Sequence, residues 1–97
     1  MSKLYVDTDA EYAKLLSDPD KTMALSFLRR EADSFINIKH LLSCCNNDDD
    51  YNRLLPQMLE SLSHIRTTKI DYLNEQFSFY QFTARKYLSK LLKEYER

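Results

Sequence analysis

The sequence predicts an all-α fold: a small helical bundle or helical hairpin with a long C-terminal helix, completed by self-association. Two observations carry this prediction. The 97 residues include no glycine, where a chain of this length usually has about seven, so tight hairpin turns are disfavoured. Apolar residues also recur at intervals of three and four, as they do on one face of a helix. The length suits one domain, expected to span residues 1–97.

The first helix is expected over about residues 9–17. Thr8 and Glu11 have the spacing of a capping box, in which each side chain bonds the other's backbone N–H. Tyr12 and Leu16 belong to the short apolar stripe that follows. The first helix is then expected to end and the second to begin within Ser17–Asp20, because Pro19 is tolerated in the first turn of a helix.

The second helix is expected over residues 19–44. Its apolar residues cover more than half of the helical circumference, which is more than one neighbouring helix can bury. We therefore expect it to lie between two others as the central element. One apolar sector holds Leu25, Leu28, Ala32, Phe35, Ile36 and Leu42, and the adjoining sector holds Met23, Phe27, Ile38 and Leu41.

The loop Cys44–Asp50 is polar and supplies asparagine and aspartate, which tolerate turn conformations where glycine is missing. One of the aspartates, or Asn52, is expected to cap the third helix after an irregular start over residues 50–54. That helix is predicted to run over residues 54–96, roughly 60 Å at 1.5 Å per residue, which favours a partner.

Within the third helix a heptad-like seam is expected to be buried, and it consists of Ile70, Leu73, Phe77, Tyr80, Ala84, Tyr87 and Leu91. Arg66 and Lys69 interrupt the apolar stripe that leads into it. The alternative to one continuous helix is a break near residues 66–69, with Thr68 capping a fourth helix and Asp71 at the box position.

Composition excludes several classes of site. Fourteen basic and 15 acidic residues leave the chain nearly neutral, and without glycine it has no phosphate-binding loop, dinucleotide fingerprint or calcium loop. His40 and Cys44 are only half of a zinc motif. No nucleophile and base occur in a recognisable arrangement. We therefore expect no enzyme activity, catalytic residues, cofactor, metal or small-molecule substrate.

The location expected from the sequence is intracellular, in the cytoplasm or nucleus, and not secreted. Cys44 and Cys45 are adjacent, a spacing that does not allow a relaxed disulfide. The first seven residues lack the apolar core of a signal peptide, and no stretch approaches the roughly 18 apolar residues of a membrane helix.

The residues expected to carry function are aromatic. Tyr72, Phe79 and Phe82 project from the side opposite the seam, and leaving such rings in water is unusual for a monomer. One interpretation is that the first or second helix covers them as core. The other, which we favour, is a protein interface for self-association or docking in a non-enzymatic adaptor, regulatory or assembly subunit. Its candidate residues are Tyr72, Phe79, Tyr80, Phe82 and Tyr87.

A basic stripe on the same helix supports an alternative function, nucleic-acid binding, since rows of lysine and arginine contact phosphates. Glu94 and Glu96 interrupt its flank, and cations are favoured at a helix C-terminus in any case. The candidate phosphate contacts are Lys86, Lys90, Lys93 and Arg97.

Overall fold

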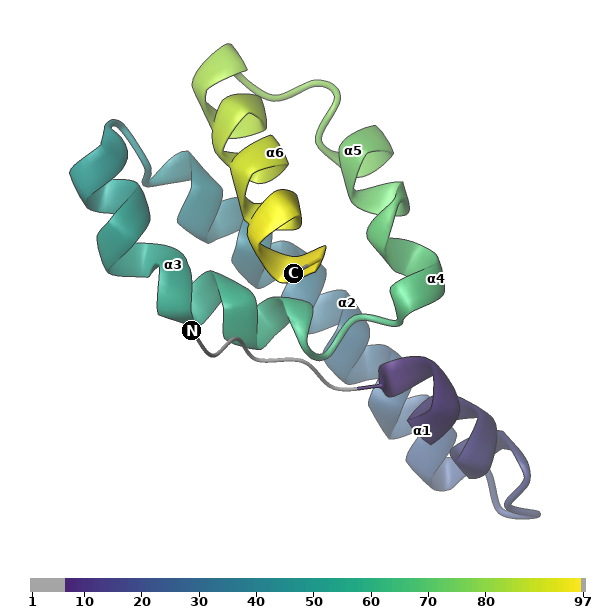
Figure 1. Cartoon of the computed structure of the whole chain (residues 1–97). Coiled ribbons are helices and arrows are strands. Elements are labelled where there is room, and N and C mark those ends of the chain that lie inside the picture. Colours follow the sequence, from purple (N-terminus) through teal and green to yellow (C-terminus); the bar gives the residue numbers. More distant parts are fainter. Residues whose placement is uncertain (1–6, 97) are drawn as a thin grey trace.

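The computed structural model describes residues 7–96, and side chains as far as Tyr95. It is all-α, as the sequence predicted, and this described part contains no strand (Figure 1). Its helices are α1 (Thr8–Leu16), α2 (Thr22–Ser43), α3 (Asp48–Leu62), α4 (Thr67–Ile70), α5 (Tyr72–Gln76) and α6 (Phe82–Glu96). The principal dimensions are 47 × 32 × 18 Å, because α1 and the beginning of α2 project from the rest of the bundle (Figure 1).

The turn between α1 and α2 differs from the prediction in where α2 begins. The Asp18 carboxylate accepts from the backbone N–H of Asp20 at 2.9 Å, which forms a local turn instead of a helix start. Lys21 then adopts a left-handed conformation with φ of 60°. Glycine usually occupies such a position, and a residue with a Cβ adopts it at a cost of about 1 kcal/mol. The helix therefore begins at Thr22 and not at residue 19.

α2 is the central element, packing against α1, α3 and α6. The two apolar sectors of the sequence analysis are buried only in part. Buried residues on α2 are Ala24, Phe27, Glu31, Ser34, Ile38, Leu41 and Leu42, whereas Leu25 and Ile36 are exposed. The helical wheel did not show which side is buried, because Glu31 and Ser34 are polar residues on that side and hydrophobicity alone does not reveal their partners.

α3 begins earlier than predicted. Asn47 is its N-cap, and its side-chain oxygen accepts from the backbone N–H of Asp50 at 2.9 Å. Three aspartates then occupy the first turn, where the helix dipole favours negative charge. Residues 50–54 are helical, so the expected irregular start and the expected cap at Asn52 were wrong. Pro56 lies inside the helix.

The predicted continuous helix over residues 54–96 is also wrong, since α3 ends at Leu62 and the chain turns over residues 63–66. The Ser63 hydroxyl donates to the Glu60 carbonyl at 2.6 Å, a bond that competes with helix continuation. Ile65 is fully buried. The break falls just before the predicted alternative, and Arg66 rather than Thr68 is the N-cap of α4.

A second break, over residues 77–81, was not predicted at all. Phe77 ends α5 and is buried, and the ring of Tyr80 meets the Phe77 ring edge-on with centroids 4.8 Å apart. These two breaks replace the predicted single long helix with shorter ones, and α6 folds back onto α2 and α3 (Figure 1). The seam that was expected to need a partner is buried within the chain: Ile70, Leu73, Phe77, Ala84, Tyr87 and Leu91 belong to one core, with Tyr80 packed against it.

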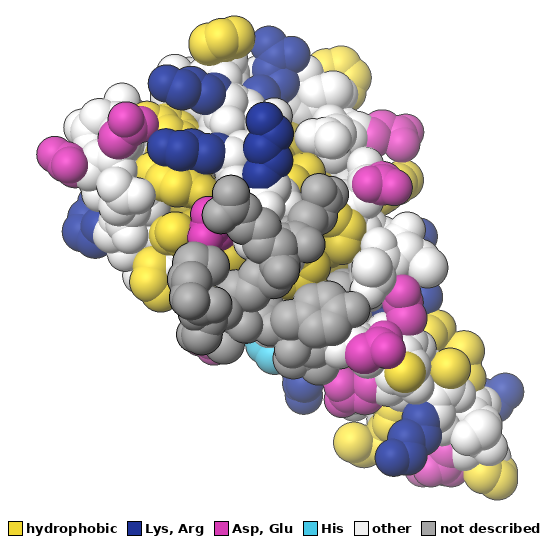
Figure 2. Space-filling view, viewed as in Figure 1, with side chains coloured by type: hydrophobic (Ala, Val, Ile, Leu, Met, Phe, Trp, Pro, Cys, Tyr) yellow, Lys and Arg dark blue, Asp and Glu magenta, His cyan; other side chains and the backbone are white. Residues whose placement is uncertain are grey.

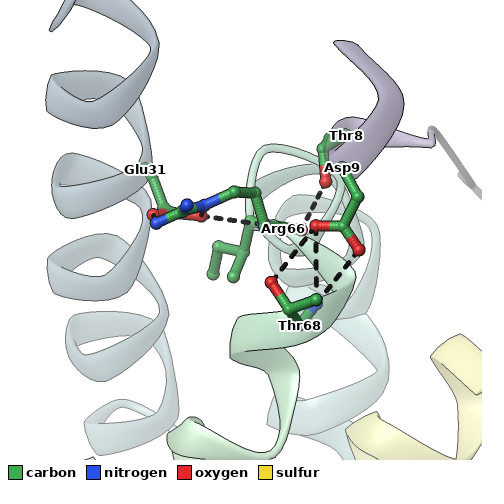
Figure 3. Close-up of polar contacts among 6 residues, drawn as sticks. Thr8, Asp9, Glu31, Arg66 and Thr68 are labelled. Carbon is green, nitrogen blue, oxygen red and sulfur yellow. Dashed lines mark hydrogen bonds and ion pairs between the residues drawn. The ribbon is translucent and has the colours of Figure 1, made fainter. Parts of the chain in front are cut away.

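A polar cluster attaches α1 to the turn before α4 (Figure 3). Arg66 forms a bidentate ion pair with the buried Glu31 of α2, at 3.1 Å from Nε and 3.0 Å from Nη2. The Asp9 carboxylate of α1 accepts from the backbone N–H and hydroxyl of Thr68 at 3.2 and 3.3 Å. The buried Thr8 hydroxyl donates to the Ile65 carbonyl at 2.8 Å. Side chains from two other helices therefore hold the start of α4.

Candidate protein interaction surface

The surface with the most exposed aromatic side chains lies where the segment between α5 and α6 meets the beginning of α6. Phe79 in this segment is 95% exposed, and Phe82, the first residue of α6, is 75% exposed. No helix covers these two rings, so the interpretation of both as ordinary core is wrong. A phenylalanine normally loses most of its contact with water on folding, because burying such a side chain is worth about 1.5–3 kcal/mol.

The other predicted interface residues are less available. Tyr72 is partly exposed, and the Lys69 ammonium lies 5.1 Å from its ring centroid. Tyr80 is half-buried against the core. Tyr87 is only 2% exposed, and it stacks on Tyr51 with centroids 5.1 Å apart. Tyr87 is thus a core residue and cannot serve as an interface contact.

Beside Phe79 the surface is hollowed. Three adjoining hollows of about 230, 400 and 270 Å³ lie between the Phe35–Ser43 part of α2 and the chain between Gln76 and Ala84. Lys39 and Tyr80 line all three, and the Lys39 ammonium lies 5.4 Å from the centroid of the Tyr80 ring. We call this region the α2 groove.

The α2 groove has an apolar edge that sequence reasoning missed. Ile36, which lines two of the hollows, is 64% exposed although the helical wheel placed it in a buried sector. Phe35 is half-buried and packs against the core. Ile36 lies 11 residues after Leu25, which is also exposed, and this spacing places both on one face of α2. The sequence carries no signal that this face is exposed, because both residues are apolar.

The predicted basic stripe is partly engaged within the chain. Lys90 pairs with Asp48 at 3.9 Å and lies 4.9 Å from the centroid of the Tyr51 ring. Lys86 and Lys93 are exposed, and Figure 2 shows Lys and Arg side chains gathered over α6. Arg97, the fourth predicted contact, lies outside the described residues.

Asp48 connects the basic stripe to the core. The Tyr87 hydroxyl donates to its Oδ1 at 2.8 Å. This hydrogen bond, with Lys90 nearby, lowers the pKa of the Asp48 carboxyl. The same bond raises the pKa of Tyr87 to about 12, since ionised tyrosine could no longer donate to the carboxylate. Lys90 and Tyr87 therefore help to anchor the start of α3 to α6.

The sulfur and imidazole groups do not gather into a metal site in the described part of the chain, where no three His, Cys, Asp or Glu side chains lie close enough to share an ion. Cys44 Sγ lies 4.0 Å from His40 Nε2 on the exposed side of α2. Cys45 is buried, and burial, with Asp50 nearby, raises the pKa of its thiol. Across residues 7–96, no helix has the length and hydrophobicity needed to cross a membrane.

Comparison of the sequence with protein-family models and with curated proteins, and of the fold with solved structures, gives no match.

Proposed function

We propose that this protein is a non-enzymatic interaction module, an adaptor or assembly subunit that binds another protein through Phe79, Phe82 and the adjoining α2 groove. The observation that supports this proposal is the exposure of the two phenylalanines, 95% and 75%, together with the hollow that Phe79 lines. Exposed aromatic side chains at the edge of a concave surface are typical of binding hot spots. Free Cys44 and Cys45 fit a reducing intracellular compartment.

Self-association was predicted from a helix too long for a compact monomer, and that reason no longer applies because α6 folds back. The aromatic surface remains available to a second copy or to a different protein. Sedimentation at micromolar concentration distinguishes the two, since a self-associating chain has a mass above 11.6 kDa.

The experiment compares two double variants with the native chain. Phe79→Ser with Phe82→Ser removes the proposed contacts, and Met23→Ser with Leu25→Ser removes two exposed apolar side chains from α2. Because all four are exposed, each change is expected to alter stability by no more than about 0.5 kcal/mol. Complexes recovered from the native cell, and any mass above the monomer, should be lost only in the phenylalanine variant. Equal losses in both variants, or no loss in either, would contradict the proposal.

Nucleic-acid binding is the second candidate, and it is favoured by the charge of the segment that runs from the end of α5 through most of α6. Residues 76–93 contain four basic residues and no acidic one. Lys86→Glu with Lys93→Glu should then abolish a retardation of DNA or RNA that weakens steeply with salt. No retardation of either nucleic acid at low salt would exclude this candidate.

A further inference from the structure

The charge of the α2 groove indicates what kind of partner would fit it. Lys39 lines all three hollows, and no aspartate or glutamate lines any of them. In the described part of the chain Lys39 makes no ion pair, and its ammonium contacts only the Tyr80 ring. A carboxylate placed at this position would therefore meet an available cation without displacing an existing partner.

The walls of the groove supply the apolar contacts. Phe35, Ile36, Phe77 and Tyr80 line the hollow of about 230 Å³, and Phe79 stands at the edge of the next one. An apolar side chain inserted there would cover the exposed parts of Ile36 and Phe79, and removing that apolar surface from water favours binding. A partner with a bulky apolar side chain and a carboxylate nearby would match the apolar lining of the groove and the charge of Lys39.

A second copy bound symmetrically matches it less well. In a twofold dimer the same patch faces itself, so the Lys39 of each copy would meet only residues of the other copy's groove, none of which is a carboxylate. A lysine buried at an interface without an acidic partner gains no charge complementarity. The charge of the groove thus favours a different protein over a symmetric dimer through this face.

We infer that the α2 groove binds an acidic amphipathic segment of another protein, with an apolar side chain in the hollow beside Tyr80 and a carboxylate on Lys39. This inference rests on the proposed function and adds the chemistry of the partner. The segment is expected to carry aspartate or glutamate one helical turn from a leucine or phenylalanine, because neighbours on a helix face are three or four residues apart.

The test measures fluorescence anisotropy with three labelled peptides of about 15 residues, long enough to form a helix on binding. One carries leucine and phenylalanine on one face and flanking glutamates, the second has lysine in place of glutamate, and the third has serine in place of the apolar residues. The native chain should bind the first peptide only. Lys39→Glu should weaken that binding by roughly tenfold or more and allow the lysine peptide to bind.

Control variants separate a groove effect from a general loss of charge or fold. Phe79→Ser should weaken binding of the acidic peptide. Lys14→Glu, at an exposed position of α1, should leave that binding unchanged. Thermal unfolding of each variant checks that the fold is kept. Equal binding of all three peptides, or a Lys39→Glu variant that binds the acidic peptide as well as the native chain does, would overturn the inference.

Two further arms cover the other classes of partner. If an oligonucleotide or a vesicle of anionic lipid binds in a Phe79-dependent manner and the acidic peptide does not, the partner chemistry inferred here is wrong. If cellular complexes or self-association still depend on Phe79 and Phe82 while no peptide binds, the inference fails and the proposed interaction function stands.

Discussion

Arg66 shows how much of this fold depends on one side chain. It interrupts an apolar stripe in the sequence, and in the structure it connects three segments. Its guanidinium pairs with Glu31 of α2, and its Cζ lies 4.3 Å from the centroid of the Tyr12 ring of α1. Its backbone N–H also donates to Glu31 at 2.8 Å. Arg66, which interrupts the apolar stripe in the sequence, is therefore the residue that attaches the start of α4 to α1 and α2.

The first prediction concerns the pair formed by Arg66 and Glu31. Arg66→Met leaves a buried carboxylate without its partner and should lower the free energy of unfolding by about 3 kcal/mol. Glu31→Met should lower the free energy of unfolding by a similar amount. The combined variant should be more stable than either single variant, because neither charge is then left buried alone. Urea unfolding of the four proteins measures this cycle, and strictly additive losses would show that the two side chains do not interact.

Tyr51 and Tyr87 are two residues whose ionisation is linked to folding. Burial raises the pKa of Tyr51 to about 12, and the hydrogen bond to Asp48 raises that of Tyr87 to about 12. In the unfolded chain both ionise near pH 10. Between pH 10 and 12 the folded protein therefore holds protons that the unfolded chain has lost, and its stability falls as the pH rises.

The second prediction follows from these shifts. A phenolate absorbance titration of the native protein should show a late phase close to pH 12, and Tyr51→Phe or Tyr87→Phe should each remove part of it. The loss of stability above pH 10 should be smaller in Tyr87→Phe than in the native chain. A titration in which neither substitution changes the late phase would contradict the assignment.

At the scale of elements, the helix ends depend on local caps where these exist and on distant side chains where they do not. Asn47, the residue just before α3, accepts a hydrogen bond from the backbone N–H of Asp50. Such a contact between near neighbours is of a type that a sequence pattern can indicate. The start of α4 instead takes its partners from Asp9 and Glu31, which lie 59 and 35 residues away in the sequence. Such long-range contacts explain why the break after Leu62 could be proposed from the sequence only as an alternative.

The third prediction distinguishes Asn47 from Asn52 as the cap of α3. Asn47→Ala should lower the free energy of unfolding by about 1 kcal/mol, since the backbone N–H of Asp50 loses its acceptor. Asn52 is exposed inside the helix, where alanine is the better helix former, so Asn52→Ala should be neutral or slightly stabilising. Thermal unfolding of the two variants decides between the observed cap and the one expected from the sequence.

Over the whole molecule, stability is distributed unevenly. Thr8 is the only buried residue of α1, whereas α3 contributes six residues to the buried set. The hairpin of α1 and the first part of α2 extends from the bundle (Figure 1). Its attachment to the rest therefore relies on Tyr12, whose ring centroid lies 4.3 Å from Cζ of Arg66, and on the polar contacts of Thr8 and Asp9.

The fourth prediction is that α1 exchanges its backbone amides before α3 does, because regions with few buried apolar contacts open at lower cost. Asp9→Ala should accelerate exchange in α1 and at Thr68, and should leave α3 unchanged. Hydrogen–deuterium exchange followed by mass spectrometry measures both. Equal protection of α1 and α3 in the native chain would show that the hairpin opens only with global unfolding.

The sequence by itself determined the all-α class and the central place of α2, and it singled out Phe79 and Phe82 as candidates whose exposure only the structure decided. These follow from apolar periodicity, helix propensity and the absence of glycine, which are local properties of the chain. Only the tertiary structure decided where the predicted last helix breaks, which side of α2 is buried and that Tyr87 belongs to the core. These features depend on partners distant in sequence. The break before α4 depends on the pairing of Arg66 with Glu31, and the burial of Tyr87 on its stacking with Tyr51. The α2 groove depends on the 77–81 turn. The partners of a buried polar pair and the position of a chain reversal are set by long-range contacts, which the periodicity of apolar residues does not predict.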